Sequence, residues 1–155
     1  MDTAIRTAIL EILSRQTDMT IATVRSDGYP QATTVSFVND DLLLYFGCGP
    51  QSQKAKNIAR NDKVSVTVTP PYTDWNSIRG LSFGGRACLI TDAGEITRLS
   101  GLFFNRFPFV VQYAPQDRSE LALIMIRPEV ISILDYRKGF GHADQIDLRR
   151  DATSS

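Results

Sequence analysis

The chain has 155 residues, 43% hydrophobic and 22% charged, and its 17 Lys and Arg residues balance its 17 Asp and Glu residues. This length and composition are those of one globular domain with a substantial core. The zero net charge argues against a nucleic-acid-binding protein, and no apolar stretch reaches the roughly 18 residues that cross a membrane. We therefore expect that the protein binds neither nucleic acid nor a membrane.

The N-terminal segment predicts an amphipathic helix rather than a signal peptide. It lacks a basic start, an apolar run and a small-residue cleavage site. One helical face would carry Ile5, Ala8, Ile9, Ile12 and Leu13. The only two cysteines, Cys48 and Cys88, form no CxxC pattern, which indicates neither a disulfide framework nor a zinc site. We therefore expect a cytoplasmic protein without a bound metal.

Short strands separated by turns follow this helix. Residues 19–25 alternate as a half-buried strand does, and a turn punctuated by Gly28 and Pro30 leads into a returning strand at residues 31–38. After a second tight turn, residues 42–47 form a continuous apolar run. Such a run predicts a strand that is buried on both faces.

The strand pattern resumes further along the chain. Residues 63–69 alternate between valine and hydroxyl side chains, and residues 78–91 form another strand in which Gly84 and Gly85 predict a bulge. The segment "DAGE" at residues 92–95 has the spacing of a capping box, which predicts the start of a third helix.

The last part of the sheet and the domain limits complete the prediction. Residues 120–126 and 129–136 predict two strands joined around Pro128. About seven strands with a few helices at the margins favour a mainly β, antiparallel barrel or sandwich over a doubly wound parallel sheet. We expect a single domain over residues 1–140 and a C-terminal tail, partly flexible, over residues 141–155.

Hydrolytic machinery is hard to assemble from these residues. His142 is the only histidine, so a histidine-rich metal site cannot form, and a Ser-His-Asp triad would depend on a residue near the end of the chain. The GxSxG, HExxH, GxGxxG and P-loop motifs are all absent. If the protein is an enzyme, we expect a bound cofactor to supply the chemistry.

The short helix after Ser52 has an unusual first turn. It contains Lys54 and Lys56 and no acidic residue, although the positive end of the helix dipole favours acids there. One explanation is an anion site in which Ser52, the free N–H groups and Lys54 hold a phosphate. The other is a solvated helix whose lysines have no ligand. The residues alone leave both explanations open.

The order of these features resembles the pyridoxamine 5'-phosphate oxidase-like family of flavin-binding split β-barrels. The matching features are the DGxP turn at residues 27–30, the S-x-K segment at residues 52–54 and the N-I-x-x-N-x-x-V-S segment at residues 57–65. The likeness covers roughly residues 15–136. It implies a homodimer of FMN-binding split β-barrels, with two FMN molecules in clefts at the subunit interface.

The resemblance also assigns positions around the flavin. The family strand beside the flavin ring corresponds to Ala32, Thr33, Thr34, Val35 and Ser36. The segment that approaches the ribityl chain corresponds to Tyr45, Phe46 and Gly47. The phosphate-binding segment corresponds to Ser52, Gln53 and Lys54. The strand that reaches the flavin from the other subunit corresponds to Gly80 and Leu81.

Two departures separate the chain from the vitamin B6 oxidases of this family. Gln53 stands where those enzymes have an arginine, which removes one bidentate phosphate donor. The C-terminal segment that clasps the B6 phosphate is also different. In its place, four residues would cover the cleft, namely Tyr136, Lys138, Phe140 and His142.

Four functions follow, in order of preference. The first is an FMN-dependent oxidoreductase that acts on a small molecule of unknown identity, without an assigned catalytic side chain. The second is a relative that binds a deazaflavin or haem. The third is a flavin-binding module without enzymatic activity, and the fourth is a ligand-binding barrel without a cofactor.

Overall fold

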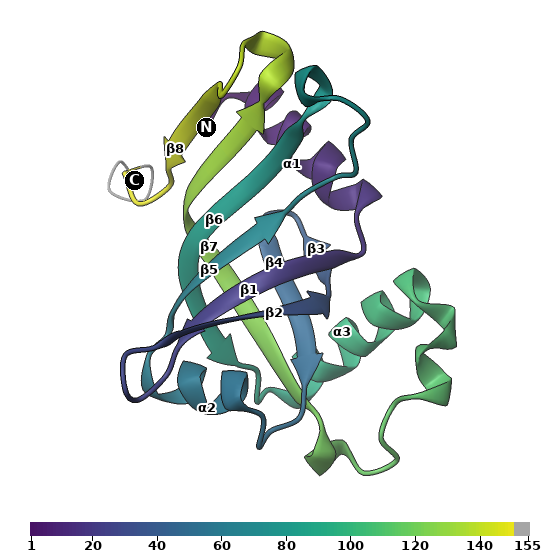
Figure 1. Ribbon diagram of the computed structural model, residues 1–155. Helices are drawn as coiled ribbons and strands as arrows, with labels where there is room; N and C mark the ends of the chain where they lie inside the picture. The colour runs from purple at the N-terminus through teal and green to yellow at the C-terminus, as the bar shows by residue number, and fades with distance from the viewer. Residues whose placement is uncertain (151–155) are drawn as a thin grey trace.

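A computed structural model describes residues 1–150 of the protein. Eight antiparallel strands form one curled sheet, with three α-helices at its margins (Figure 1). The strands are β1 (Asp18–Val24), β2 (Pro30–Ser36), β3 (Val38–Asp40), β4 (Leu43–Cys48), β5 (Lys63–Val68), β6 (Arg79–Leu89), β7 (Ala122–Asp135) and β8 (Ala143–Asp147). Their order in the sheet is β2-β1-β5-β6-β7-β4-β3, with β8 paired to β7. The expected mainly β, antiparallel architecture is confirmed.

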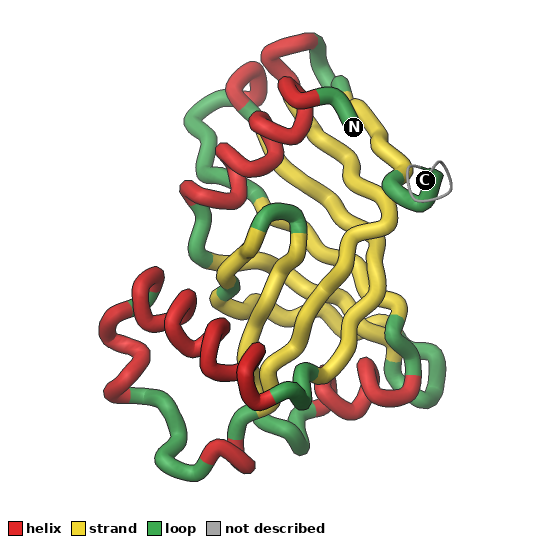
Figure 2. Tube along the Cα trace, turned by 180° about the vertical axis from the view of Figure 1, so that it is seen from behind, coloured by secondary structure: helices red, strands yellow, loops and turns green. Residues whose placement is uncertain are grey.

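Helices occupy the two ends of the curled sheet. The α-helices are α1 (Thr3–Arg15), α2 (Gln53–Arg60) and α3 (Ala93–Arg106), and the short 3-10 helices are η1 (Trp75–Ser77), η2 (Pro108–Gln112), η3 (Arg118–Glu120) and η4 (Tyr136–Lys138). Figures 1 and 2 show that α2 and α3 lie at the same end of the sheet, and that α3 and the chain after it project away from it. Within residues 1–150, no helix is both long and apolar enough to span a bilayer.

Alternation along the strands builds the core inside the curled sheet. In β5 the side chains of Val64, Val66 and Val68 are buried and the intervening residues are exposed, as the sequence predicted. The predicted apolar face of α1 packs on this core through Ile9, Ile12 and Leu13. A second, smaller core lies beneath α3 and contains Val38, Tyr45, Leu99, Phe107 and Leu123.

The pairing of β6 with β7 confirms the predicted bulge and corrects one strand boundary. The register shifts between Gly84 and Gly85, and a Cβ atom on Gly85 would lie 2.4 Å from the carbonyl oxygen of Arg127. We predicted two strands joined around Pro128, but β7 is continuous from Ala122 to Asp135. Pro128 pairs with Gly85 at the bulge, a position that tolerates the missing N–H of proline.

Part of the C-terminal segment forms a strand, β8, that the sequence did not predict. Strand β8 pairs with residues 130–134 of β7 after a turn in which Gly139 and Gly141 have φ angles of 143° and 74°. Ile146 and Leu148 pack against the main core. These contacts explain why a polar segment joins the sheet. The remainder of the expected tail, residues 151–155, lies outside the described residues.

Candidate functional site

The curled sheet is open along a seam between β2 and β4. Strand β3 pairs with β4 only at residues 43–45, so the edge of residues 46–48 that faces away from β7 has no partner strand among residues 1–150. In the same described part of the chain, β2 pairs only with β1 and lies beside β4. Unpaired strand edges present backbone N–H and C=O groups. The seam therefore offers backbone hydrogen-bonding groups to a ligand.

A groove of about 590 Å³ borders this seam. The two strands contribute Thr34, Val35, Ser36 and Gly47. The facing wall consists of Phe103 from α3, Phe109 and Val110 from η2, and Phe107 and Tyr113 on either side of η2. The volume is in the range of small-molecule binding sites.

Helix α3, which contributes Phe103 to this wall and leads into η2, is held at both ends. Asp92 caps it by accepting a hydrogen bond from the Glu95 N–H at 2.9 Å, as predicted. The Glu95 carboxylate binds Arg98, which also binds Asp40 at 2.8 Å. At the other end, Arg106 donates to the carbonyl oxygens of residues 14 and 16 at the end of α1. The aromatic wall therefore has a defined position relative to β2 and β4.

The structure brings only some of the predicted ring-contacting residues to the groove. Thr34, Val35 and Ser36 line it, whereas Ala32 and Thr33 belong to the same strand but do not. Their positions in β2 follow from the sequence, but the extent of the groove is set by α3 and η2.

The predicted residues of β4 divide between three environments. Tyr45 is 1% exposed beneath α3, where burial raises the pKa of its hydroxyl and the Arg98 guanidinium lies 5.9 Å from its ring. Phe46 is fully buried in the main core. Only Gly47 faces the groove. The Tyr45 and Phe46 side chains are buried and do not reach the groove, and of these two residues only Phe46 lies on the unpaired edge of β4.

The first turn of α2 lies next to the groove along the chain. Residues 49–51 connect the end of β4 to Ser52, whose Oγ accepts a hydrogen bond from the Ala55 N–H at 3.4 Å. The predicted helix cap is thus confirmed. The N–H groups of Gln53 and Lys54 have no backbone acceptor among residues 1–150. In the same part of the chain, the ammonium groups of Lys54 and Lys56 have no carboxylate partner.

A buried asparagine fixes the position of α2. The Asn57 side chain is fully buried, and its Nδ2 donates to Thr23 Oγ1 at 2.9 Å and to Gln31 Oε1 at 3.3 Å. Its Oδ1 accepts from Gln53 Nε2 at 2.8 Å. The Gln53 amide is therefore used in anchoring the helix. We did not assign a role to Asn57 from the sequence, although a polar residue beside Ile58 on the inward helix face is a recognisable signal.

Gly80 and Leu81 do not join this site in the same chain. Both are buried, and they lie at the end of β6 that pairs with Leu134 and Ile133. The groove lies near the other end of the β6–β7 ribbon, about 33 Å away along β7 for the ten residues from Ile133 to Leu123 at 3.3 Å per residue. A role for Gly80 and Leu81 at the groove would need a second copy of the chain.

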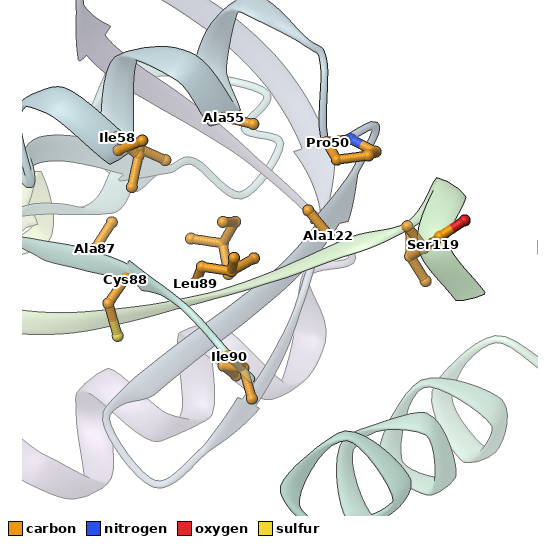
Figure 3. A pocket seen from close by; sticks show the side chains of 12 residues that line it. Pro50, Ala55, Ile58, Ala87, Cys88, Leu89, Ile90, Ser119 and Ala122 are labelled. Carbon is orange, nitrogen blue, oxygen red and sulfur yellow. The ribbon is translucent and has the colours of Figure 1, made fainter. Parts of the chain in front are cut away.

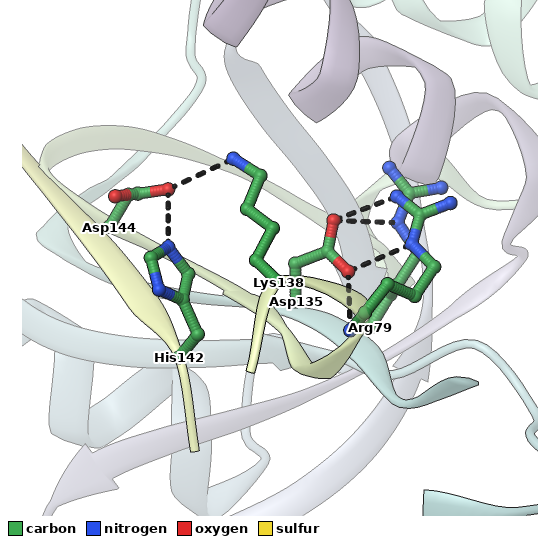
Figure 4. A network of polar contacts seen from close by, with 6 residues as sticks. Arg79, Asp135, Lys138, His142 and Asp144 are labelled. Atoms are coloured by element: carbon green, nitrogen blue, oxygen red, sulfur yellow. Dashed lines mark hydrogen bonds and ion pairs between the residues drawn. The ribbon is translucent and has the colours of Figure 1, made fainter. Parts of the chain in front are cut away.

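The C-terminal residues that we expected over the cleft gather at this same distant end. The Tyr136 and Phe140 rings lie 5.2 Å apart, and Trp75 lies 6.2 Å from Phe140. Figure 4 shows Lys138 and His142 both directed at the Asp144 carboxylate, at 3.3 and 3.1 Å. This end therefore presents exposed aromatic rings around a polar network.

A second carboxylate secures the same region. Asp135 is 6% exposed and accepts hydrogen bonds from the Arg137 side chain at 2.7 and 2.8 Å, and Arg79 lies 3.9 Å away (Figure 4). The hydrogen bonds from Arg137 outweigh burial and hold the pKa of Asp135 at about 2. The ionised carboxylate fixes the turn between β7 and β8.

The sequence matches the family model of pyridoxamine 5'-phosphate oxidase over residues 5–135. The chain belongs to the pyridoxamine 5'-phosphate oxidase family. The match includes both strands of the seam, α2, and the end of β6 that carries Gly80 and Leu81. A search of curated proteins found no match.

Several solved structures share the split-barrel fold of this chain. A candidate pyridoxamine 5'-phosphate oxidase from Listeria innocua is 26% identical with a TM-score of 0.69, covering 84% of this chain and 98% of that one. An F420 reductase is 28% identical with a TM-score of 0.64, covering 79% and 94%. The haem storage protein HutZ from Vibrio cholerae is 19% identical with a TM-score of 0.69, covering 79% and 89%. The predicted split barrel is confirmed, and its neighbours include proteins named for different cofactors.

A second cavity of about 540 Å³ lies between α2 and the ends of β6 and β7. Figure 3 shows Ala55 and Ile58 of α2 on one side and Ala87 and Leu89 of β6 on the other. None of the predicted site residues lines it. Among residues 1–150, no three His, Cys, Asp or Glu side chains come together as metal ligands.

Proposed function

We propose that this family member is an FMN-binding oxidoreductase, with the flavin ring along the seam between β2 and β4. One observation carries the proposal. Residues 30–54 supply the open strand seam, one side of the ligand-sized groove and a helix start whose Lys54 has no carboxylate partner among residues 1–150, and residues 100–123 supply the rest of the groove. These are the three parts that a flavin, its ribityl chain and its phosphate require.

The start of α2 fits the phosphate of the cofactor. The N–H groups of Gln53 and Lys54 and the Ser52 hydroxyl can donate hydrogen bonds to phosphate oxygens, and Lys54 adds a positive charge. A lysine in a first turn costs a few tenths of a kcal/mol on its own because it opposes the dipole. A bound dianion reverses the sign of this interaction, which gives the lysine a reason to be there.

The residues of the groove fit a positioning role in catalysis. When bound, FMN would supply the hydride-transfer chemistry. The backbone edges of residues 46–48 and the hydroxyls of Thr34 and Ser36 can orient its polar ring edge. Among residues 1–150, no carboxylate, imidazole, amine or thiol lines the groove, so these residues would orient the reactants and exclude water rather than transfer a proton.

We propose that the active form is a homodimer with a composite cofactor site. Exposed aromatic side chains lie at the end of the β6–β7 ribbon that carries Gly80 and Leu81, with Phe140 78% and Trp75 67% exposed, and the unpaired edge of β4 lies at the other end. A two-fold axis would place each end of one copy against the opposite end of its partner. Gly80 and Leu81 would then mark the strand end that reaches the partner's flavin.

A titration of the purified protein with FMN tests the cofactor assignment. We expect Lys54→Ala to weaken FMN binding by about 1–3 kcal/mol, the range for losing a charge-assisted hydrogen bond. Lys56→Ala is the matched control, because it removes the same charge two residues further along the same helix. An equal effect of the two substitutions, or no effect of either, would reject the phosphate site.

The absorption spectrum and the oligomeric state test the remaining parts. A flavin spectrum supports the proposal, whereas a deazaflavin or haem spectrum of the isolated protein would replace it with the second hypothesis. Sedimentation should give a dimer at micromolar concentration, and a monomer that binds FMN with full affinity would exclude the composite site. Turnover of a reductant by the FMN-loaded protein separates an enzyme from a binding module.

A further inference from the structure

We propose that the groove beside the seam binds an uncharged aromatic compound as the second reactant. This proposal rests on the proposed function, because it assigns the ligand that would face the cofactor. It differs from a B6-type assignment, in which the substrate carries a phosphate group.

The wall of the groove is a continuous series of aromatic rings. The Phe103 and Phe107 rings are stacked at 6.5 Å, Phe107 and Phe109 meet edge to face at 5.9 Å, and Phe109 and Tyr113 do so at 6.4 Å. Edge-to-face and offset contacts are the geometries that aromatic rings prefer. A further flat ring can extend this series within the groove.

Two of these rings, those of Phe109 and Tyr113, are exposed to solvent, and the neighbouring Phe107 is packed in the core. Phe107 is 7% exposed and belongs to the core beneath α3, whereas Phe109 is 58% and Tyr113 77% exposed. Large exposed apolar side chains gathered at one place mark a binding site more often than an ordinary surface. Here they line the same groove as Thr34 and Ser36, the hydroxyl-bearing residues of the seam.

The absence of charge in the groove selects against an ionic ligand. No charged side chain of the described residues, 1–150, lines it. An anion that entered would lose part of its hydration without gaining a charged partner, which is unfavourable. An adjoining pocket shares five lining residues with the groove, among them Leu121 and Leu123, and also contains Arg118. The groove itself therefore suits a neutral ring.

A pair of probes that differ only in charge tests this selectivity. Equilibrium dialysis at pH 7 would compare 2-naphthol with 2-naphthyl phosphate, using the wild-type protein with and without FMN. We expect 2-naphthol to bind at least about tenfold more tightly, a difference of 1.4 kcal/mol. Equal binding, or tighter binding of the phosphate ester, would overturn the proposal. Loss of a phosphate preference in Arg118→Ala would show instead that the cavity is an anion site.

Three variants locate the binding surface. Phe109→Asp and Tyr113→Asp each place a carboxylate in the groove, and we expect each to weaken 2-naphthol binding about tenfold or more. Val111→Asp is the matched control, since Val111 is on the same short helix, is 64% exposed and does not line the groove. It should change binding less than about twofold. An equal loss in Val111→Asp and Phe109→Asp would place the probe elsewhere and refute the proposal.

The FMN titration separates this proposal from the one on which it rests. A protein that binds FMN but does not prefer the neutral probe loses only the substrate assignment. A protein that prefers the neutral probe in its groove but fails to bind FMN loses the cofactor assignment and keeps an aromatic ligand site.

Discussion

The anchoring of α2 by Asn57 makes a quantitative prediction for Asn57→Ala. This side chain is fully buried and makes three side-chain hydrogen bonds, to Thr23, Gln31 and Gln53. Truncation removes all three and leaves the buried hydroxyl of Thr23 without this donor. Because the helix start is the proposed phosphate site, the same substitution should also loosen the groups that meet the cofactor.

The magnitude follows from the number and geometry of these bonds. A net contribution of about 0.5–1.5 kcal/mol per hydrogen bond, with the 3.3 Å bond to Gln31 at the low end, gives a loss of about 1.5–3.5 kcal/mol in the free energy of unfolding. For a domain of this size, a loss of about 3 kcal/mol lowers the Tm by roughly 6–12 °C.

Chemical denaturation followed by circular dichroism measures this loss. Asn61→Ala is the matched control, because Asn61 lies at the end of the same helix and its side chain makes one exposed hydrogen bond, from the Lys63 N–H at 3.1 Å. We expect it to cost about 1 kcal/mol or less. A loss below about 1 kcal/mol for Asn57→Ala, or the same loss in both variants, would refute the anchoring role.

Two further predictions concern the β6–β7 ribbon. Gly85→Ala should destabilise the protein by about 1–3 kcal/mol in urea denaturation, since its Cβ would lie 2.4 Å from the Arg127 carbonyl oxygen, whereas a Cβ at Gly84 meets nothing within 4 Å. Equal stability of Gly85→Ala and Gly84→Ala would contradict the close approach. The Asp135 pKa of about 2 lies below its ordinary value of 3.8, so its stabilising effect is complete above about pH 5 and is lost as the pH falls towards 2. Wild type should lose about 2 kcal/mol more than Asp135→Asn over this interval, and parallel pH profiles would disprove the linkage.

Local patterns in the sequence determined most of the secondary structure. The alternating valines of β5, the caps at Ser52 and Asp92 and the bulge at Gly84 and Gly85 all depend on neighbouring residues or on backbone freedom, so the sequence predicts them correctly. The family motif between residues 19 and 68 likewise predicted the split barrel. The same motif predicts that the start of α2 binds the FMN phosphate, and this stays a prediction.

Only the tertiary structure decided which side chains meet one another. Strand pairing across the bulge made β7 continuous through Pro128, and pairing with β7 drew β8 into the sheet from a segment with no strong strand pattern. The inward face of α2 gave Asn57 its partners on β1 and β2. Such contacts join residues far apart in the chain, so their register and burial depend on the whole sheet rather than on any local pattern. For the same reason, the seam and its aromatic wall could be recognised only after β2, β4 and α3 were placed together.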